Sequence, residues 1–588
     1  MLRRYFEEEM RYLHEAGRAF AGAFPEQARL LNVDSVTDRD PYVERLFEGF
    51  AFLTGRIRER LDDELPQYTE TLCRLLFPHF LKPVPSLALV ELRPRPGEVQ
   101  TTTLLPRGTE VRSEPVGEDR TVCRFVTTQD VRLQPLRLAA ADLGRTPDGA
   151  SELTLRFQLE GGADYHALKL SPLRLHLHAD PATASFLHLF LTRHVRRVRV
   201  GPGGFGDDRP AFGAEPVTLQ GQEWVQPGGL GEDEGLLPYS PQTFSGFRLL
   251  QEYLTFRRKF WCVDLRGLDR FAPSVPVGSF DVKVAFDRPY PEERRFRTED
   301  LRLFCSPVVN LFEHDADPIR VDHRVPEYRV PVNQRQRLEV YDVLSGVGVE
   351  DRTGRRHVYT PFLAFRHARS GDRRYFTESS GFGPTGRYQT SVSLDTMEQD
   401  GSLAPETLSL EVRCTNGSFP REKLQERTLT RLAPGVPDVA RPSNLTQPTL
   451  ILYPPVRRQQ DFFWKLLSHW SFNYQTVASR EALQGLIELY DWTDADANRR
   501  RAAGIQSVAW KPKEILYRGA ILRGAEVTVQ VQEDHFADEG DVVLFGLVLS
   551  RFFSMYATLN SFVHLNLELL LSGRTYQWQP KHGERPLL

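Results

Sequence analysis

The feature that most constrains this chain is a change in its hydrophobic period near residue 83. Up to about Leu81, apolar residues recur every three to four positions, which is typical of amphipathic helices. Pro83 and Pro85 end that pattern, because proline is poorly tolerated in a helix interior. Beyond them, apolar and polar residues alternate, as in 153–159 and 173–178, which predicts half-buried β-strands. The chain therefore combines a helical N-terminal region with a β-rich body.

Three helical segments are expected in the N-terminal region. The first covers about residues 2–20 and the third ends near Phe80. The middle segment has the clearest pattern, because Asp40 offers a capping side chain and Pro41 suits the first helical position. Its apolar residues recur at helical spacing: Val43, Leu46, Phe47, Phe50, Leu53, Ile57 and Leu61.

A length of 588 residues exceeds what one hydrophobic core serves, since single cores stop growing at about 250–300 residues. With 40% hydrophobic and 11% aromatic residues, the chain has ample apolar surface to bury. We expect an α+β multidomain protein with a helical N-terminal segment, an antiparallel sandwich-like or barrel-like middle and a mixed α/β C-terminal region. The expected domains are 1–85, 86–290, 291–455 and 456–588.

Two further segments shape this expectation. The Gly/Pro/Asp-rich stretch near 201–235 predicts a mobile surface insertion in the second domain. The apolar run 542–571 predicts a long helix, and Arg551 interrupts it, so no stretch of about 18 uncharged apolar residues remains for a membrane span. A helix in the core, or one that faces a partner, is the expected role of this run.

Net charge and cysteine spacing argue against several classes of function. The formal net charge is -3, so no bulk attraction to nucleic acid is expected. Five cysteines lie far apart, with no pair at metal-site or redox-motif spacing. Reduced thiols in the cytoplasm fit this pattern, and the acidic amphipathic N-terminus does not resemble an export signal.

Histidines give weak signals for a metal site. His176 and His178 are two residues apart, which in a strand places both on one face, and His188 and His194 follow. A zinc site needs a third ligand, so we expect solvent-facing histidines at the polar positions of the strand. The phrase 314–317, His-Asp-Ala-Asp, is expected to form a turn held by side-chain-to-backbone hydrogen bonds. No catalytic constellation, metal or cofactor is predicted.

Several phrases, in the same order from end to end, resemble the TssF family, baseplate subunits of the bacterial type VI secretion system. The helical region carries the wording DPYVERLFEGFAFL and LFPHFLKP, and the body carries FSGFRLLQEY and FWCVDL. The similar segments include 40–53, 61–66, 76–83, 236–239, 244–253, 260–265, 305–319, 408–416, 464–469, 523–528 and 543–549.

The resemblance implies a non-enzymatic assembly protein of the cytoplasm. Two TssF copies would embrace one TssG, and these units would join TssK and TssE into wedges of a phage-like ring under the contractile sheath. Contacts with sheath, tube or spike components would follow. TssK would connect the ring to the membrane complex, so the protein would lie at the cytoplasmic face of the inner membrane without touching lipid directly.

Function in such a protein resides in its surfaces. The N-terminal helices and the run 542–571 are the expected interface helices, although a core role is an equal alternative. The expected anchors are Trp464, Trp470, Phe552, Phe553 and Tyr556.

Two other classes of function stay open at the level of sequence. A metal-dependent hydrolase would use the His176/His178 strand or the His314 turn. A β-sandwich glycan-binding module would use aromatic residues of 201–239.

Overall fold

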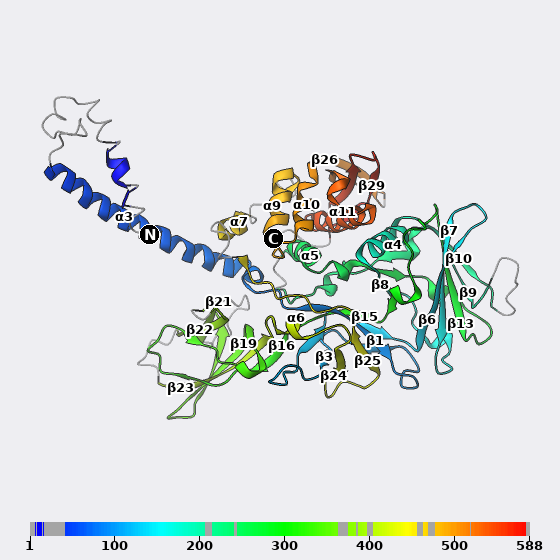
Figure 1. The fold of residues 1–588 in the computed structure, drawn as a ribbon, viewed down its shortest axis with the longest axis horizontal. Helices are drawn as coiled ribbons and strands as arrows, with labels where there is room; N and C mark the ends of the chain where they lie inside the picture. Colours follow the sequence, from blue (N-terminus) through cyan, green and yellow to red (C-terminus); the bar gives the residue numbers. More distant parts are fainter. Residues whose placement is uncertain are drawn as a thin grey trace. The chain divides into compact units, whose positions relative to one another are not determined.

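The structure is a computed structural model of the chain (Figure 1). It describes residues 6–7, 9–14, 16, 41–205, 214–239, 244–362, 374–383, 386–396, 404–455, 462–468, 477–517 and 519–583. The chain divides into two compact units. The first consists of Met1–Pro78 with Val456–Ser471, and the second consists of His79–Pro455 with Phe472–Leu588.

The first unit is built on one long helix, α3 (Pro41–Leu76), drawn in blue in Figure 1. Its 36 residues correspond to a length of about 54 Å. The short helix α7 (Phe462–Ser468) packs against it, and the Cys73 thiol lies 3.6 Å from the Phe463 carbonyl oxygen. The second and third helices expected from the sequence are therefore one helix. Pro66 removes one N–H donor, but helical spacing continues on both sides, so the helix does not end there.

The second unit begins within the 3-10 turn Pro78–Leu81 and continues into a six-stranded antiparallel sheet. Strand β1 lies inside this sheet, and its first six residues are buried. Strands from both expected middle domains join here, so the expected limit at 290–291 does not separate two sheets, and the four-domain division stays a prediction. The strand order is β24 (Leu429–Leu432), β3 (Glu110–Ser113), β4 (Arg124–Thr127), β15 (Cys305–Val309), β1 (Leu87–Pro94) and β25 (Ala440–Asn444).

Two further sheets and a small ribbon follow in this unit. Buried and exposed residues alternate along β7, which confirms the half-buried strand expected at 153–159. The range 201–235 supplies β10 and β11, both paired in sheets, so it is not simply an inserted loop; residues 206–213 lie outside the described residues. The strand orders are β10 (Val217–Gln220), β9 (Val195–Pro202), β13 (Ser279–Phe286), β7 (Ser151–Leu159), β6 (Leu136–Arg145); then β11 (Val225–Pro227), β12 (Cys262–Leu265), β8 (Leu173–Leu177), β14 (Leu301–Leu303); then β2 (Thr103–Leu105) with β5 (Val131–Leu133).

An eight-stranded sheet carries its own hydrophobic core. Val321, Val392, Leu408, Val412 and Cys414 are fully buried in it. The phrase around His314 is strand β16, in which His314 pairs with Val412, so the turn expected there is wrong. The order is β16 (Phe312–Asp315), β23 (Glu406–Thr415), β19 (Glu339–Glu350), β20 (Arg356–Pro361), β21 (Arg374–Phe382), β22 (Tyr388–Thr396) and β18 (Tyr328–Arg329), with β17 (Ile319–Val321) paired to β23.

The C-terminal sheet contains a parallel pair. Strands β27 and β28 run parallel, which requires a crossover connection, and α11 (Glu539–Ser554) supplies it. The run 542–571 is therefore helix α11 followed by strand β28, not one helix, because apolar residues alternate with polar ones at its end. The order is β26 (Ile505–Tyr517), β27 (Ala520–Val531), β28 (Phe562–Leu569) and β29 (Thr575–Gln577), with β30 (Lys581–His582) paired to β28.

Helix α11 is the buried centre of the C-terminal region, with 14 of its 16 residues buried. It packs against β28 and against helices α4 and α5. The approach to α4 is close at Gly540, where an added Cβ would clash with the Ser185 carbonyl oxygen and lie 2.8 Å from the Phe186 amide nitrogen. Further helices in the described part of the chain are α4 (Pro181–Arg193), α5 (Ser245–Thr255), α6 (Phe419–Lys423), α9 (Arg480–Tyr490) and α10 (Asp496–Ala503). The α+β class predicted from the sequence is confirmed.

His176, which was expected to face solvent, and His188 are both buried. His176 lies in β8, an inner strand of its sheet, and is 1% exposed. Burial and the positive charge of Arg174 lower the pKa of His176 to about 3. His188 lies on α4, where burial and Arg193 lower its pKa to about 4. Both rings are therefore neutral in the folded protein at neutral pH, and the solvent-facing position expected for His176 is wrong.

The close approach of α11 to α4 predicts a glycine requirement. We expect Gly540→Ala to lower the melting temperature, because the new methyl group meets backbone atoms that cannot rotate away; overpacking of this kind costs about 1–3 kcal/mol. Gly485→Ala on α9 is the matched control, since an added Cβ there meets nothing within 4 Å. Equal melting temperatures for the two variants would contradict this account.

The buried histidines predict a loss of stability in mild acid. An unfolded histidine takes up a proton near pH 6.5, whereas folded His176 and His188 do so only near pH 3 and 4. Below pH 6.5 the unfolded state therefore binds more protons, and stability falls by about 1.4 kcal/mol per pH unit for each histidine. Urea midpoints between pH 7 and pH 5 measure this slope. His188→Gln should make it shallower, and an unchanged slope would refute the assignment.

Candidate assembly surfaces

Helix α3 presents a row of exposed apolar side chains. Leu46, Phe50 and Leu53 are 63%, 59% and 60% exposed. Their spacings of four and three residues place them on one face of the helix. Other large exposed apolar side chains on the same helix are Tyr42, Phe52 and Leu72.

Other positions of α3 are buried. Ala51 and Cys73 are fully buried. Near the start of the helix, the His14 Nε2 atom lies 2.9 Å from Glu44 Oε1, and the His14 ring lies 6.1 Å from that of Phe47. The helix thus has packed positions as well as an exposed apolar face. Removing such a face from water is favourable, which makes it a candidate docking surface.

The anchors expected in the run 542–571 lie in the interior of the second unit. Phe552, Phe553 and Tyr556 are all buried. The Tyr556 ring is 4.3 Å from that of Phe244, and the Phe552 ring is 6.3 Å from that of Phe247 on α5. Their packing matches the core alternative that the sequence left open. An interface role for these three side chains stays a prediction, and it would require α11 to move.

The two expected tryptophan anchors differ in what the structure says of them. Trp464 on α7 is 57% exposed, whereas Phe462 and Leu466 on the same helix are buried. Its side chain is therefore available to a partner. Trp470 lies outside the described residues. No direct observation tests the interface role of either residue.

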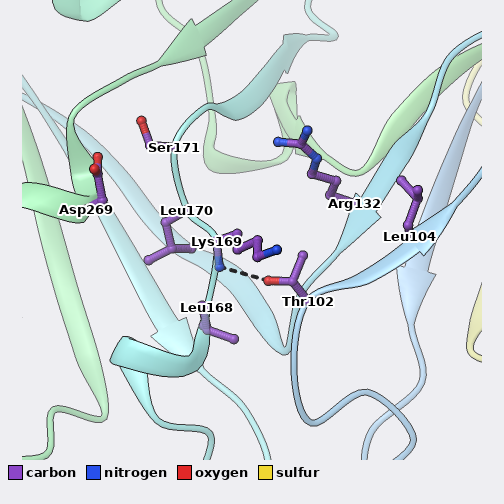
Figure 2. Close-up of a pocket in the computed structure, with 8 residues that line it drawn as sticks. All are labelled: Thr102, Leu104, Arg132, Leu168, Lys169, Leu170, Ser171 and Asp269. Carbon is purple, nitrogen blue, oxygen red and sulfur yellow. Dashed lines mark hydrogen bonds between the residues drawn. The ribbon is translucent and has the colours of Figure 1, made fainter.

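Sequence reasoning missed two exposed features. The hairpin of β26 and β27 extends past the part paired with β28, which covers only Ala525–Val531. The cross-strand pair Leu516 and Ile521 is exposed near its tip, and a Gly519 turn between two apolar residues was the available signal. A pocket beside the β2–β5 ribbon, drawn in Figure 2, is lined by residues distant in sequence and left no such signal.

Among the described residues, no group of three or more His, Cys, Asp and Glu side chains is arranged to hold a metal ion. All five cysteines are buried, and burial raises the pKa of the Cys123 and Cys414 thiols to about 12. These two cysteines are therefore protonated thiols and poor nucleophiles at neutral pH.

No helix in the described part of the chain is both long enough and apolar enough to cross a membrane. Helix α3 has the length, but its sequence includes many charged residues.

Comparison with known proteins places these features in one family. The family model described as "Type VI secretion system, TssF" matches residues 1–585. The type VI secretion system component TssF1 of Pseudomonas aeruginosa is 31% identical over 638 aligned positions, which cover 99% of each chain.

Solved structures give the same result. A chain of the TssK-TssF-TssG baseplate subcomplex, determined by cryo-electron microscopy, matches with a TM-score of 0.78 and 35% identity over 93% of this chain and 99% of that one. A chain of the baseplate complex from the type VI secretion system matches with a TM-score of 0.61 and 32% identity over the full length of both chains. Since the family model and the relative both extend over nearly all of the chain, this protein belongs to the TssF family of the type VI secretion system.

Proposed function

We propose that this chain is a structural, non-catalytic subunit of the type VI secretion baseplate wedge that assembles with TssG and TssK. The observation that carries the proposal is the exposed apolar face of α3, in a chain similar over nearly its full length to one solved with TssK and TssG. Buried aromatic side chains hold the body of the protein together, while apolar side chains stay exposed on one long helix. This combination is suited to a scaffold.

The α3 face is proposed to dock against helices of TssG and of a second copy of this chain. Leu46, Phe50 and Leu53 would form the apolar centre of that contact. Burying a side chain of this size contributes about 1.5–3 kcal/mol. Three such residues on one face can therefore support a stable helical interface once the cost of association is met.

The finer parts of the proposal concern stoichiometry and place. Two copies of this chain would join one TssG, and the unit would combine with TssK and TssE to form the platform for sheath and tube assembly. The site of action is the cytoplasmic face of the inner membrane. Contact with the membrane would be indirect, through the membrane complex. No cofactor or metal enters this role.

No second function is put forward. The hydrolase alternative depended on His176 and on the His314 turn, but His176 is buried and His314 lies in a strand. The glycan-binding alternative depended on aromatics of 201–239. Of these, Phe205 is buried, and the Tyr239 ring lies 4.4 Å from the His79 ring at an interplanar angle of 36°.

The α3 face gives a direct test. We expect Leu46→Asp with Leu53→Asp to weaken TssG binding about a hundredfold, because two carboxylates would enter an apolar contact. The folded body should persist, since both leucines are exposed. The measurement is the Kd for purified TssG, with circular dichroism as the test of folding.

Leu559→Asp with Leu571→Asp is the matched control, because these leucines are 56% and 65% exposed in the second unit. Equal loss of TssG binding in both double variants would show that α3 has no special role. Unchanged binding in the α3 variant would remove the proposed docking face.

Stoichiometry is tested on the complex itself. Light scattering on purified particles of this chain with TssG should give the mass of two copies per TssG. The α3 variant should elute as free chain. A monomer that does not associate with TssG would refute the scaffold proposal as a whole.

A further inference from the structure

A pocket of about 550 Å³ lies beside the ribbon of β2 and β5, within the usual range of ligand sites, about 300–1,000 Å³. Figure 2 shows its wall, the segment 168–171, facing the ribbon. Two hydrogen bonds fix that wall. The Lys169 amide donates to Thr102 Oγ1 at 2.8 Å, and Gln134 Nε2 donates to the Lys169 carbonyl oxygen at 2.6 Å. The cavity is thus bounded by tethered backbone.

The ribbon side of the lining includes one apolar side chain, Leu104. Leu104 is 52% exposed, and its ribbon neighbour across the strands is Arg132. Leu168 and Leu170 line the same pocket from the opposite wall and are themselves buried. Leu104 can therefore contact one large apolar side chain that enters the hollow, with Leu168 and Leu170 on the opposite wall.

The same pocket carries unbalanced positive charge. Arg132 and Lys169 line it and are exposed. Within the residues that the structure describes, neither of these side chains has an ion-pair partner, whereas nearby Arg174 is paired with Asp264 at 2.7 Å. Asp269 is the one acidic lining residue. Figure 2 places it beside Ser171, on the other side of the pocket from Arg132 and Leu104.

We propose that this pocket binds an extended acidic segment of a partner subunit, in which a carboxylate side chain stands next to a large apolar one. The carboxylate pairs with Lys169 and Arg132, and the apolar side chain packs on Leu104. Asp269 repels a second carboxylate at the far end, so it fixes the direction of the segment. This inference rests on the proposed function, because it assumes that the chain works within a multisubunit baseplate.

A segment with both chemistries explains the lining better than a free anion. A small anion would use the two cations and leave Leu104 exposed. A purely apolar segment would leave Lys169 and Arg132 partly dehydrated without a counter-charge, which is unfavourable. The combination of an exposed leucine and two cations in one hollow therefore favours an acidic and apolar peptide.

The test uses the full chain with purified TssG and purified TssK. We expect Arg132→Glu with Lys169→Glu to weaken binding of one of the two about tenfold at low salt, and less at high salt. Arg356→Glu with Lys423→Glu is the matched control, since both residues are exposed and lie outside the pocket. Affinities within twofold of wild type for both TssG and TssK would overturn the proposal.

Two further measurements test the apolar contact and the charged contact of the proposed site separately. Leu104→Ser should weaken binding of the same partner. If only the charge variant weakens that binding, the site binds an anion alone and the proposal fails. Zero-length carbodiimide coupling should join the Lys169 amine to an Asp or Glu of that partner with a large apolar residue within two positions. Coupling only to a second copy of this chain would also overturn it.

The outcomes remain distinguishable from failure of the proposed function. If the wild-type chain binds neither TssG nor TssK, the scaffold role fails, and the pocket proposal falls with it. If wild type binds and the α3 variant loses TssG while the pocket variants behave as wild type, the scaffold role stands and only the pocket proposal is refuted.

Discussion

The second unit depends on a strand that is buried on both faces. The first six residues of β1 are buried, so each of its backbone N–H and C=O groups needs a partner inside the protein. Strand β15 pairs along one side, and β25 pairs with the second half of the other side. Where β25 ends, the hydroxyls of Thr446 and Thr449 accept from the Leu89 and Leu87 amides at 3.0 and 2.9 Å. Segments about 200 and 350 residues downstream are thereby fixed to one strand.

Buried asparagines extend this constraint to the neighbouring sheet. Asn310 directly follows β15, and its Oδ1 atom accepts from the Asn416 amide at 2.7 Å and the Thr415 hydroxyl at 2.8 Å, at the end of β23. The six-stranded and eight-stranded sheets are therefore joined by hydrogen bonds of a buried side chain. A buried amide with all its partners present is costly to displace, so this junction should behave as one rigid body.

The sequence predicted those parts of the fold that depend on local periodicity. The amphipathic helix that begins at Pro41, the alternating strand β7 and the overall α+β class followed from spacing alone. The ends of the helices were harder to predict from the sequence, because the continuation through Pro66 depends on the residues beyond it. The burial of His176 was not accessible either, since the polar positions of β8 face outward only if one side of its sheet is open to water. Strand pairing across hundreds of residues leaves no local pattern.

Some candidate surfaces were predicted and others were not, because the sequence reveals only local spacing. Large aromatic residues suggested α11 as an interface helix, but α11 packs against β28 and also against α4 and α5, and its Phe552 side chain contacts Phe247 on α5. The α3 face was visible in the spacing of Leu46, Phe50 and Leu53, although spacing does not reveal which face of a helix is covered. The pocket at Lys169 was invisible, because its lining comes from the β2–β5 ribbon, the 168–171 segment and Asp269.

The two surfaces proposed here differ in the kind of contact they can make. Apolar contacts have little directionality, so a helix face of leucine and phenylalanine can accept more than one neighbour with small adjustments of side-chain rotamers. Charged contacts with a repelling group at one end, as at Lys169 and Asp269, accept a single orientation. On the proposed stoichiometry of two copies per TssG, the subunit would need both properties, because the same face would meet different helices while each copy still takes one defined position.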